Sequence, residues 1–263
     1  MKKLMIGNEA VARGLYEGGV SVVASYPGTP STEITEFLSE YRDLYSEWAP
    51  NEKVATEVAF GASLSGVRAV TCMKHVGLNV AADPLFTLSY TGVNGGLVIC
   101  VADDPAMHSS QNEQDSRHYA KASKIPMLEP SDSAECLAYA KEAFTISEAF
   151  DTPVLFRLCT RIAHSQSVVE TGERVVPDAI PYERKGEKFI MMPGNAKKRH
   201  PFVEERLKKL TAFSETTPLN RIEMGGKHVG VITSGTCYQY VREALGDQVS
   251  VLKIGRASCR ERV

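Results

Sequence analysis

Four short apolar runs, each separated from the next by helical patterns, constrain the fold of this chain more than any other feature. The runs mostly lack polar–apolar alternation, which is typical of strands buried on both faces. They cover Val20–Ser25, Arg68–Met73, Gly96–Val101 and Pro153–Leu158. Helical patterns lie at Glu9–Glu17, Pro30–Leu44, Val54–Ser65, Leu78–Tyr90 and Ser133–Phe150. This alternation predicts an α/β fold with a doubly wound parallel sheet, in which ligands bind beyond the carboxyl ends of the strands.

Composition restricts the classes of partner. The 263 residues carry a net charge of −2, which gives no reason to expect a nucleic acid or an anionic membrane as partner. The sequence has neither an apolar run of ~20 residues nor a secretory signal at its start. Its six cysteines are widely spaced without a C-x-x-C pair, and Cys72, Cys100 and Cys159 lie in or beside strand-like runs. We therefore expect a cytoplasmic protein with no metal or iron–sulfur site in this stretch.

The pattern divides the chain into four parts. Residues 1–167 form the first α/β domain, and residues 168–226 form a proline- and charge-rich linker with a helix-like stretch at Phe202–Phe213. A strand–helix–strand pattern at 227–253 indicates the truncated start of a second α/β domain. The basic cluster at 195–200 suggests either a phosphate contact or, as we prefer, a solvated face.

The final residues, 254–263, follow no core pattern. The string from Ile254 to Val263 also resembles a translated DNA-sequencing adapter, with Ile254 and Gly255 ambiguous. We expect a non-native tail and leave it out of the functional argument.

A turn after the first apolar run is the first candidate site. In the stretch from Ser25 to Glu33, Gly28 permits close approach of a ligand, Thr29 can cap a helix, and Pro30 suits its first turn. The backbone amides of such a helix start suit an anion or a carboxylate. A well-made turn without a ligand fits these residues equally well.

Glu57 is the second candidate. On the helix that we expect from Val54, it shares a face with Val58 and Gly61 and has small neighbours, so we expect its carboxylate to be buried. A buried carboxylate needs a partner, which is a ligand nitrogen, a basic side chain or another subunit. Glu33, Glu36, Glu40 and Glu52 have the pattern of exposed helical acids. Spacing alone leaves a structural role for Glu57 as open as a catalytic one.

Two further segments follow predicted strands. The long polar stretch Asp103–His118 contains Arg117, which could hold a carboxylate through two hydrogen bonds, although a self-bonded surface loop is equally compatible. His108 and His118 make a weak metal site. In the segment Met73–Asn79, the side chains of Lys74, His75 and Asn79 could line the same ligand-binding site at the end of the strands. Alternatively, these residues simply begin a helix. The dinucleotide, P-loop and nucleophile-elbow motifs are all missing from the sequence, which disfavours those enzyme classes.

In order along the chain, these segments resemble the thiamine-diphosphate-dependent 2-oxoacid:ferredoxin oxidoreductases, and among them the alpha subunits that act on indolepyruvate. The resemblance runs from Met1 to about Lys253. The segments that carry it are Gly7–Ala10, Tyr26–Ser31, Asn51–Glu57, Met73–Asn79, Ala82–Pro84 and Asp104–Arg117.

The resemblance implies roles for these residues. Residues 1–167 would be a pyrimidine-binding domain, in which Glu57 matches the glutamate that contacts the pyrimidine of thiamine diphosphate. Thr29 and Arg117 would bind the substrate, and Pro27, Gly28, His75 and Asn79 would lie beside the coenzyme. The reaction implied is oxidative decarboxylation of an aryl-2-oxoacid such as indolepyruvate, with coenzyme A as co-substrate and ferredoxin as electron acceptor.

The family's subunits also continue beyond the matched region. Mg and 4Fe–4S clusters are expected in that missing part, and the family's complete subunit works with a beta subunit. We therefore expect the fragment alone to be inactive. Two alternatives remain: a non-oxidative thiamine-diphosphate decarboxylase or transferase, and a non-catalytic α/β binding module.

Overall fold

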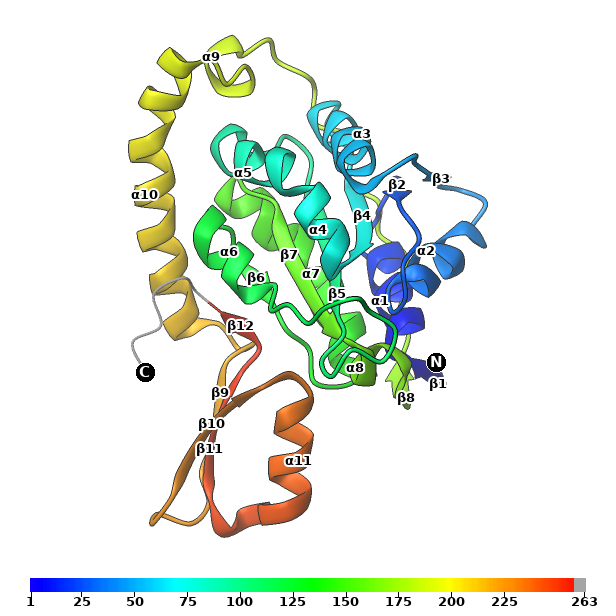
Figure 1. Ribbon diagram of the computed structural model, residues 1–263, viewed down its shortest axis with the longest axis vertical. Coiled ribbons are helices and arrows are strands. Elements are labelled where there is room, and N and C mark those ends of the chain that lie inside the picture. Colours follow the sequence, from blue (N-terminus) through cyan, green and yellow to red (C-terminus); the bar gives the residue numbers. More distant parts are fainter. Residues whose placement is uncertain (258–263) are drawn as a thin grey trace.

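A twisted, mostly parallel sheet lies at the centre of the computed structural model, which describes residues 1–257 (Figure 1). The strand order is β12-β6-β7-β5-β4-β2-β3, and every pair is parallel except β12 with β6. The strands are β2 (Val22–Ser25), β3 (Tyr45–Trp48), β4 (Ala69–Lys74), β5 (Leu97–Asp103), β6 (Met127–Leu128), β7 (Val154–Cys159) and β12 (Arg256–Ala257). The doubly wound parallel sheet is therefore confirmed.

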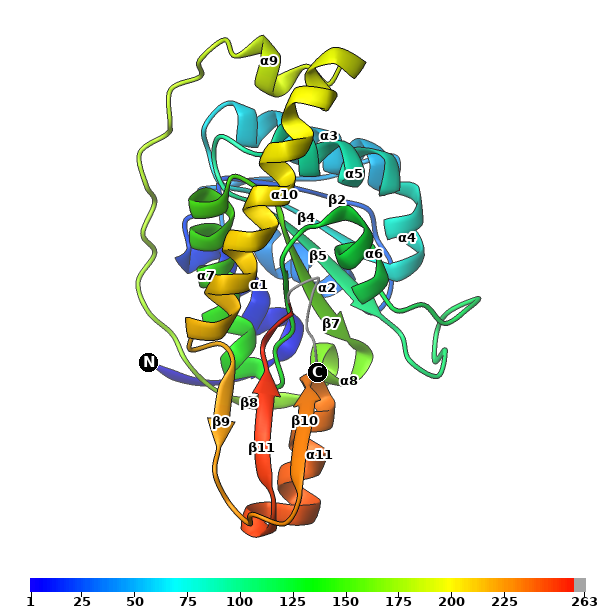
Figure 2. The ribbon, with the colours of Figure 1, turned by 90° about the vertical axis from the view of Figure 1, so that its left-hand side faces the viewer.

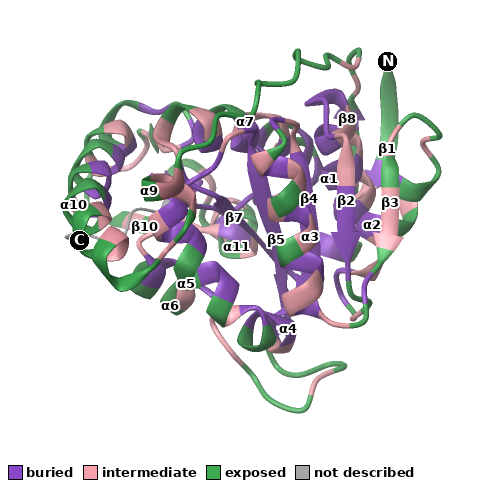
Figure 3. Ribbon diagram, turned by 90° about the horizontal axis from the view of Figure 1, so that it is seen from above, coloured by how far each residue is buried: buried purple, intermediate pink, exposed green. Residues whose placement is uncertain are grey.

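Helices cover both faces of this sheet, so its central strands β4, β5 and β7 are buried on both sides, whereas the edge strand β3 is partly exposed (Figure 3). One face carries α1 (Gly7–Glu17), α2 (Thr32–Ser39) and α7 (Ser133–Phe150), and the other carries α3 (Glu52–Leu64), α4 (His75–Val80), α5 (Ala82–Thr91) and α6 (Arg117–Ser123). Along β5, Cys100 packs toward the first group of helices and Ile99 toward the second. Cys72, Cys100 and Cys159 are buried, free core residues, as expected.

The helical pattern at Leu78–Tyr90 forms two helices, not one. The chain already turns helical at His75, and α4 gives way to α5 at Ala81. Pro84 lies in the first turn of α5, where its missing amide hydrogen costs no helical bond. The sequence pattern missed β6, which has only two residues, and β3, a four-residue edge strand that is partly exposed and has no apolar run.

The order of the strands creates a switch point between β2 and β4. From β2 the chain goes outward to β3 at the edge, then returns to β4 on the other side of β2 and continues in the opposite direction. In doubly wound sheets the carboxyl ends of the strands on either side of such a reversal form the ligand-binding crevice.

Beyond the sheet, β1 (Lys2–Ile6) pairs antiparallel with β8 (Gln166–Glu170), which follows α8 (Thr160–His164). An extended segment then runs along the outside of the molecule to α9 (Gly186–Phe189) (Figure 2). Backbone hydrogen bonds hold it, among them Thr171 N to Met1 O at 2.9 Å, Val175 N to Glu17 O at 3.0 Å and Ile180 N to Gly66 O at 2.9 Å.

The predicted linker contains a 24-residue helix, α10 (Pro193–Thr216), twice the length of the expected Phe202–Phe213. It returns alongside the first domain and packs on α5 (Figure 2). Arg199 donates to the carbonyl of Tyr90 and to Asp151, and buried Arg206 donates to the carbonyls of Asp151 and Ser89. The basic cluster is therefore only partly solvated, because Arg199 binds the protein.

The domain boundaries predicted from the sequence stay a prediction. Within residues 1–257 no helix combines the length and apolar character needed to cross a bilayer.

A small second unit follows α10. It comprises β9 (Arg221–Glu223), β10 (Gly230–Ser234), α11 (Gly235–Leu245), the 3₁₀ turn Gly246–Gln248 and β11 (Ser250–Ile254). Strands β10 and β11 are parallel and β9 is antiparallel to β11, which agrees with the strand–helix–strand pattern.

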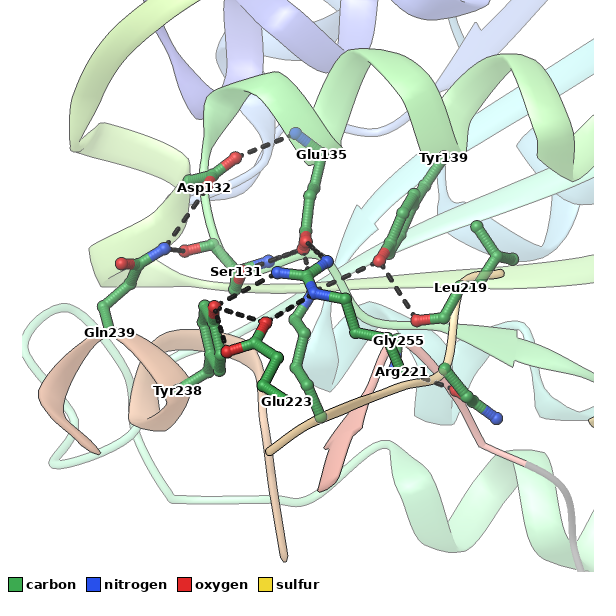
Figure 4. A network of polar contacts seen from close by, with 12 residues as sticks. Ser131, Asp132, Glu135, Tyr139, Leu219, Arg221, Glu223, Tyr238, Gln239 and Gly255 are labelled. Carbon is green, nitrogen blue, oxygen red and sulfur yellow. Dashed lines mark hydrogen bonds and ion pairs between the residues drawn. The ribbon is translucent and has the colours of Figure 1, made fainter. Parts of the chain in front are cut away.

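A polar network joins this unit to α7 (Figure 4). Glu135 of α7 accepts from Lys253, whose side chain is fully buried, and from Arg221 at 3.0 Å. Arg221 also binds Glu223 at 2.7 Å, and Tyr238 donates to Glu223 at 2.8 Å. Burial would raise the pKa of Glu135, but the Lys253 charge and the Ser131 hydrogen bonds outweigh it and lower the pKa.

The first four residues of the expected tail, 254–257, are ordered parts of the fold. Ile254 ends β11, the Gly255 carbonyl accepts from the Glu129 amide at 2.8 Å, and Arg256–Ala257 form β12 against β6. These residues therefore pack on the domain although they follow no core pattern. Whether they are native stays a prediction, and residues 258–263 lie outside the described part.

We predict that Glu135→Ala loosens the second unit from α7. The change leaves Lys253 buried without its carboxylate, which typically costs about 3–5 kcal/mol. Limited proteolysis between residues 216 and 227 should become markedly faster. Exposed Glu215→Ala serves as the control. An unchanged cleavage rate for Glu135→Ala would show that the network does not hold the unit.

Candidate functional site

Three adjacent strands end at the switch point, and within a few residues each is followed by a residue of the candidate site. The Gly28 turn follows β2, Glu52 follows β3 after a short connection, and His75 follows β4. Because these strands are parallel neighbours, their carboxyl ends lie at one edge of the sheet.

The turn after β2 is fixed by its own hydrogen bonds. The Gly28 amide donates to Thr32 Oγ1 and the Ser31 hydroxyl donates to the Gly28 carbonyl, both at 2.8 Å. Asn8, fully buried at the start of α1, donates to the Pro30 carbonyl at 2.8 Å and to Glu33 at 2.9 Å. The N-terminal segment and the turn are thus one unit.

Pro27 and Thr29 are exposed at this turn, and Gly28 is half-buried. The predicted capping by Thr29 is wrong: α2 begins at Thr32 with Ser31 as its N-cap residue, so Pro30 also precedes the first turn. Because the bonds of Gly28 and Ser31 already close the turn, the Thr29 side chain is left facing outward.

Lys74 lies beneath this turn at the end of β4. A Cβ atom on Gly28 would meet the Lys74 Cβ at 3.0 Å, so glycine allows the two backbones to approach closely. The Lys74 residue is only 9% exposed. Its Nζ donates to the Ser109 carbonyl in the long loop after β5.

His75 is fully buried at the first position of α4, and its Nε2 lies 3.1 Å from the Asn112 carbonyl. A carbonyl can only accept, so Nε2 is the donor, and in a neutral ring Nδ1 keeps its lone pair. Nδ1 is buried without a hydrogen-bond partner in the described part of the chain. Asn79 is exposed and accepts from the Tyr119 hydroxyl.

The expected burial of Glu57 is wrong, because its side chain is exposed. The buried face of α3 consists instead of Glu52, Ala55, Thr56, Ala59 and Ser63. Alanine at 55 and 59 lets the helix approach the sheet closely, whereas the face with Val58 and Gly61 turns outward. Glu52, interpreted from its pattern as an exposed helical acid, is 9% exposed.

Glu52 is therefore the acid at this edge of the sheet. Asn51 caps α3 by accepting from the Val54 amide at 3.0 Å, which fixes Glu52 in the first helical position. A Cβ atom on Gly77 would lie 2.4 Å from Glu52 Oε1, so the carboxylate occupies space that only glycine leaves free. No hydrogen bond or ion pair reaches this carboxylate from residues 1–257.

The loop after β5 forms hydrogen bonds within itself and to the sheet. This agrees with the interpretation of Asp103–His118 as a self-bonded surface loop. Buried Asp104 accepts from the Ser109 amide at 2.7 Å, the Ser110 hydroxyl at 2.6 Å and Thr160 Oγ1 at 2.7 Å. Burial alone would raise the pKa of Asp104, but the bonds from Ser110, Ser109 and Thr160 outweigh it and hold the pKa well below its usual range.

Arg117 begins α6 at the end of this loop and is exposed. Asp115 occupies one edge of its guanidinium, with Nε–Oδ1 at 2.9 Å and Nη2–Oδ2 at 2.8 Å. His108 and His118 are both exposed. Residues 1–257 contain no group of three or more His, Cys, Asp or Glu side chains placed to hold a metal ion.

These groups define the chemistry open to the site. The Glu52 carboxylate, on a residue that is only 9% exposed, has no partner within residues 1–257 and can accept a hydrogen bond from an N–H group of a ligand. Lys74 supplies a positive charge beside the Gly28 turn. The arrangement fits an N–H-bearing heterocycle together with an anion.

We predict that Asp104→Ala frees the loop from the sheet. Three hydrogen bonds to a carboxylate are lost, so amide hydrogen exchange at residues 105–114 should rise by about 10-fold or more. Exposed Asp83→Ala is the control. Because the pKa of Asp104 is low in the folded state, its contribution to stability is complete above about pH 4 and declines only as the pH falls further. Equal amide hydrogen exchange rates in the two variants would show that Asp104 does not hold the loop.

Comparison with known sequences places these residues in a family. Residues 13–221 match the family model described as "Pyruvate flavodoxin/ferredoxin oxidoreductase, thiamine diP-bdg". Indolepyruvate oxidoreductase subunit IorA of Archaeoglobus fulgidus is 47% identical over 93% of this chain and 41% of its own length. The subunit of the same name from Pyrococcus horikoshii is 44% identical over 97% and 41%. The chain thus spans less than half the length of these relatives.

Among solved structures, the 2-oxoglutarate:ferredoxin oxidoreductase of Magnetococcus marinus, with 2-oxoglutarate, coenzyme A and succinyl-CoA bound, has a similar fold. The TM-score is 0.77 at 19% identity, over 97% of this chain and 54% of that one. The sheet, its switch point and the sequence match together show that this chain belongs to the thiamine-diphosphate-binding family of pyruvate flavodoxin/ferredoxin oxidoreductases.

Proposed function

We propose that this chain is the coenzyme-activating part of an oxidoreductase that decarboxylates aryl-2-oxoacids, with indolepyruvate as the substrate. The whole protein transfers the acyl group to coenzyme A and the electrons to ferredoxin. The similarity to the IorA subunits supports this assignment.

A single observation carries the proposal: Glu52 is only 9% exposed at the switch point of the sheet, and no hydrogen bond or ion pair from residues 1–257 holds its carboxylate. A carboxylate in this position is free to accept a hydrogen bond from a ligand nitrogen. The aminopyrimidine of thiamine diphosphate bears such a nitrogen. Gly77 leaves the space that this carboxylate needs.

We therefore assign to Glu52 the role that the resemblance gave to Glu57. Glu52 would accept a hydrogen bond from a protonated ring nitrogen of the pyrimidine and so stabilise the form of the coenzyme that can take up the proton from C2. Bound thiamine diphosphate supplies the carbon nucleophile and the electron sink for loss of CO₂. Glu57, exposed on the opposite side of α3, has no role in this step.

The other predicted residues follow the neighbouring strand ends. We assign Pro27 and Gly28, in the turn after β2, to contact with the coenzyme and exposed Thr29 to contact with the substrate. We likewise assign buried His75, after β4, and exposed Asn79, on α4, to contact with the coenzyme. Arg117 offers Nη1 to a substrate carboxylate, since Asp115 occupies its Nε–Nη2 edge.

The parts outside this chain complete the enzyme. Mg and the coenzyme's diphosphate bind in the remaining region of the subunit, as do the 4Fe–4S clusters, and the beta subunit joins the assembly. We place the enzyme in the cytoplasm, where the free thiols of the core stay reduced.

Reconstitution of the complete subunit with its beta subunit tests the proposal. Indolepyruvate should support coenzyme A-dependent reduction of ferredoxin. Release of the aldehyde without reduction of ferredoxin would favour the non-oxidative alternative. The absence of any reaction with 2-oxoacids in a coenzyme-loaded assembly would refute the proposal.

We predict that Glu52→Gln slows exchange of the coenzyme's C2 proton by about 10²- to 10⁴-fold, because the amide cannot hold the pyrimidine's proton. Nuclear magnetic resonance of the loaded enzyme measures this rate, and coenzyme affinity is measured alongside. Glu57→Gln is the matched control on the same helix and should leave exchange unchanged. Slow exchange in Glu57→Gln with unchanged exchange in Glu52→Gln would assign the role to Glu57 instead.

We predict that Arg117→Ala raises KM for the 2-oxoacid by about 10-fold, with a smaller effect on kcat, since a charge-assisted contact to the substrate is lost. Steady-state kinetics of the complete enzyme measures both constants. An unaltered KM would remove Arg117 from the substrate site.

A further inference from the structure

Lys74 is only 9% exposed, and its ammonium has no counter-charge among residues 1–257. Within these residues it donates to the neutral carbonyl of Ser109, and no carboxylate lies within ion-pair distance of it. Two other buried cations differ in this respect. Arg157 binds Asp103 at 2.7 Å and also Glu129, and Lys253 binds Glu135.

A buried charge without a counter-charge is costly. The Lys74 ammonium has three N–H donors, and the carbonyl of Ser109 takes one. The remaining donors and the whole positive charge are available to an anion. Arg117, by contrast, already has the carboxylate of Asp115 on one edge and is exposed to water.

The position of Lys74 identifies the anion it would meet. The side chain lies under the Gly28 turn, next to exposed Thr29, and one turn of α4 separates it from Gly77, which contacts Glu52. Lys74 and Glu52 are both buried yet do not form an ion pair with each other. Two opposite, unpaired charges at one edge of a sheet fit a site where a bound ligand contributes a group to each.

We infer that Lys74 binds the carboxylate of the 2-oxoacid substrate. This inference rests on the proposed function, and it adds a cation that the family resemblance did not assign. The Ser109 hydrogen bond orients the ammonium, and the Asp104 anchor fixes Ser109 in turn. Substrate binding supplies the missing negative charge, and the Gly28 turn lets the carboxylate come close.

The test uses Lys74→Gln in the complete, coenzyme-loaded enzyme. Glutamine keeps an N–H donor for Ser109 but removes the charge. We expect KM for indolepyruvate to rise about 10- to 100-fold, the range for a lost hydrogen bond to a charged group. Lys74→Arg, which keeps the charge, should recover part of this loss. Exposed Lys198→Gln on α10 is the matched control and should behave as the unsubstituted enzyme.

A second readout separates substrate binding from a structural role. Indole-3-propionate and its neutral amide are compared as competitive inhibitors. The unsubstituted enzyme should bind the carboxylate more tightly than the amide, and Lys74→Gln should lose most of this difference. If the variant weakens both inhibitors equally, or if KM is unchanged, the inference is overturned.

A third readout addresses the other anion of the reaction, the diphosphate of the coenzyme. In Lys74→Gln, coenzyme affinity and exchange of the C2 proton should remain unchanged, in contrast to Glu52→Gln. Weaker coenzyme binding with an unaltered KM would assign Lys74 to the diphosphate and overturn the inference. Failure of the unsubstituted enzyme to use any 2-oxoacid would instead refute the proposed function.

Discussion

The alignment of three parallel strand ends is the constraint on which the rest of the structure depends. Because β3, β2 and β4 are neighbours and end at one edge, residues more than 20 positions apart in sequence meet there: Gly28, Glu52 and Lys74. Burial of two opposite charges that do not neutralise each other is unfavourable in an isolated domain. The helices on both faces, which bury the central strands β4, β5 and β7, stabilise the fold enough to hold them.

The parallel sheet could be predicted from sequence, because its strands are continuous apolar runs and its long helices have clear periodicity. The site was predicted only in part. The Gly28 turn and the Lys74–Asn79 segment were found, since glycine and polar residues directly after a strand are a strong local signal. Burial was expected for Glu57 but is observed for Glu52, five residues earlier, because the face of α3 was judged from its small side chains alone. Asn51, a capping residue directly after a strand, was the signal for Glu52.

Contacts that depend on distant residues could not be predicted. The start of α10 at Pro193 was missed because Pro201, inside the helix, normally interrupts one. The inward residues Arg199 and Arg206 are charged, and their partners lie on α5 and after α7. The long loop after β5 is held by Asp104, whose partners lie five, six and 56 residues away, and by Lys74 and His75 at the end of β4. Local patterns cannot report such pairings, since the partners become neighbours only when the sheet is assembled.

The long helix α10 also determines where the polypeptide tolerates changes of length. Each residue removed from a helix rotates everything beyond it by about 100°. A single deletion between Arg199 and Arg206 would therefore turn one of these two side chains away from its carbonyl partners. Residues 181–185 are exposed and precede the helix. Insertions accumulated during evolution should therefore concentrate in residues 181–185, while the spacing within α10 stays fixed.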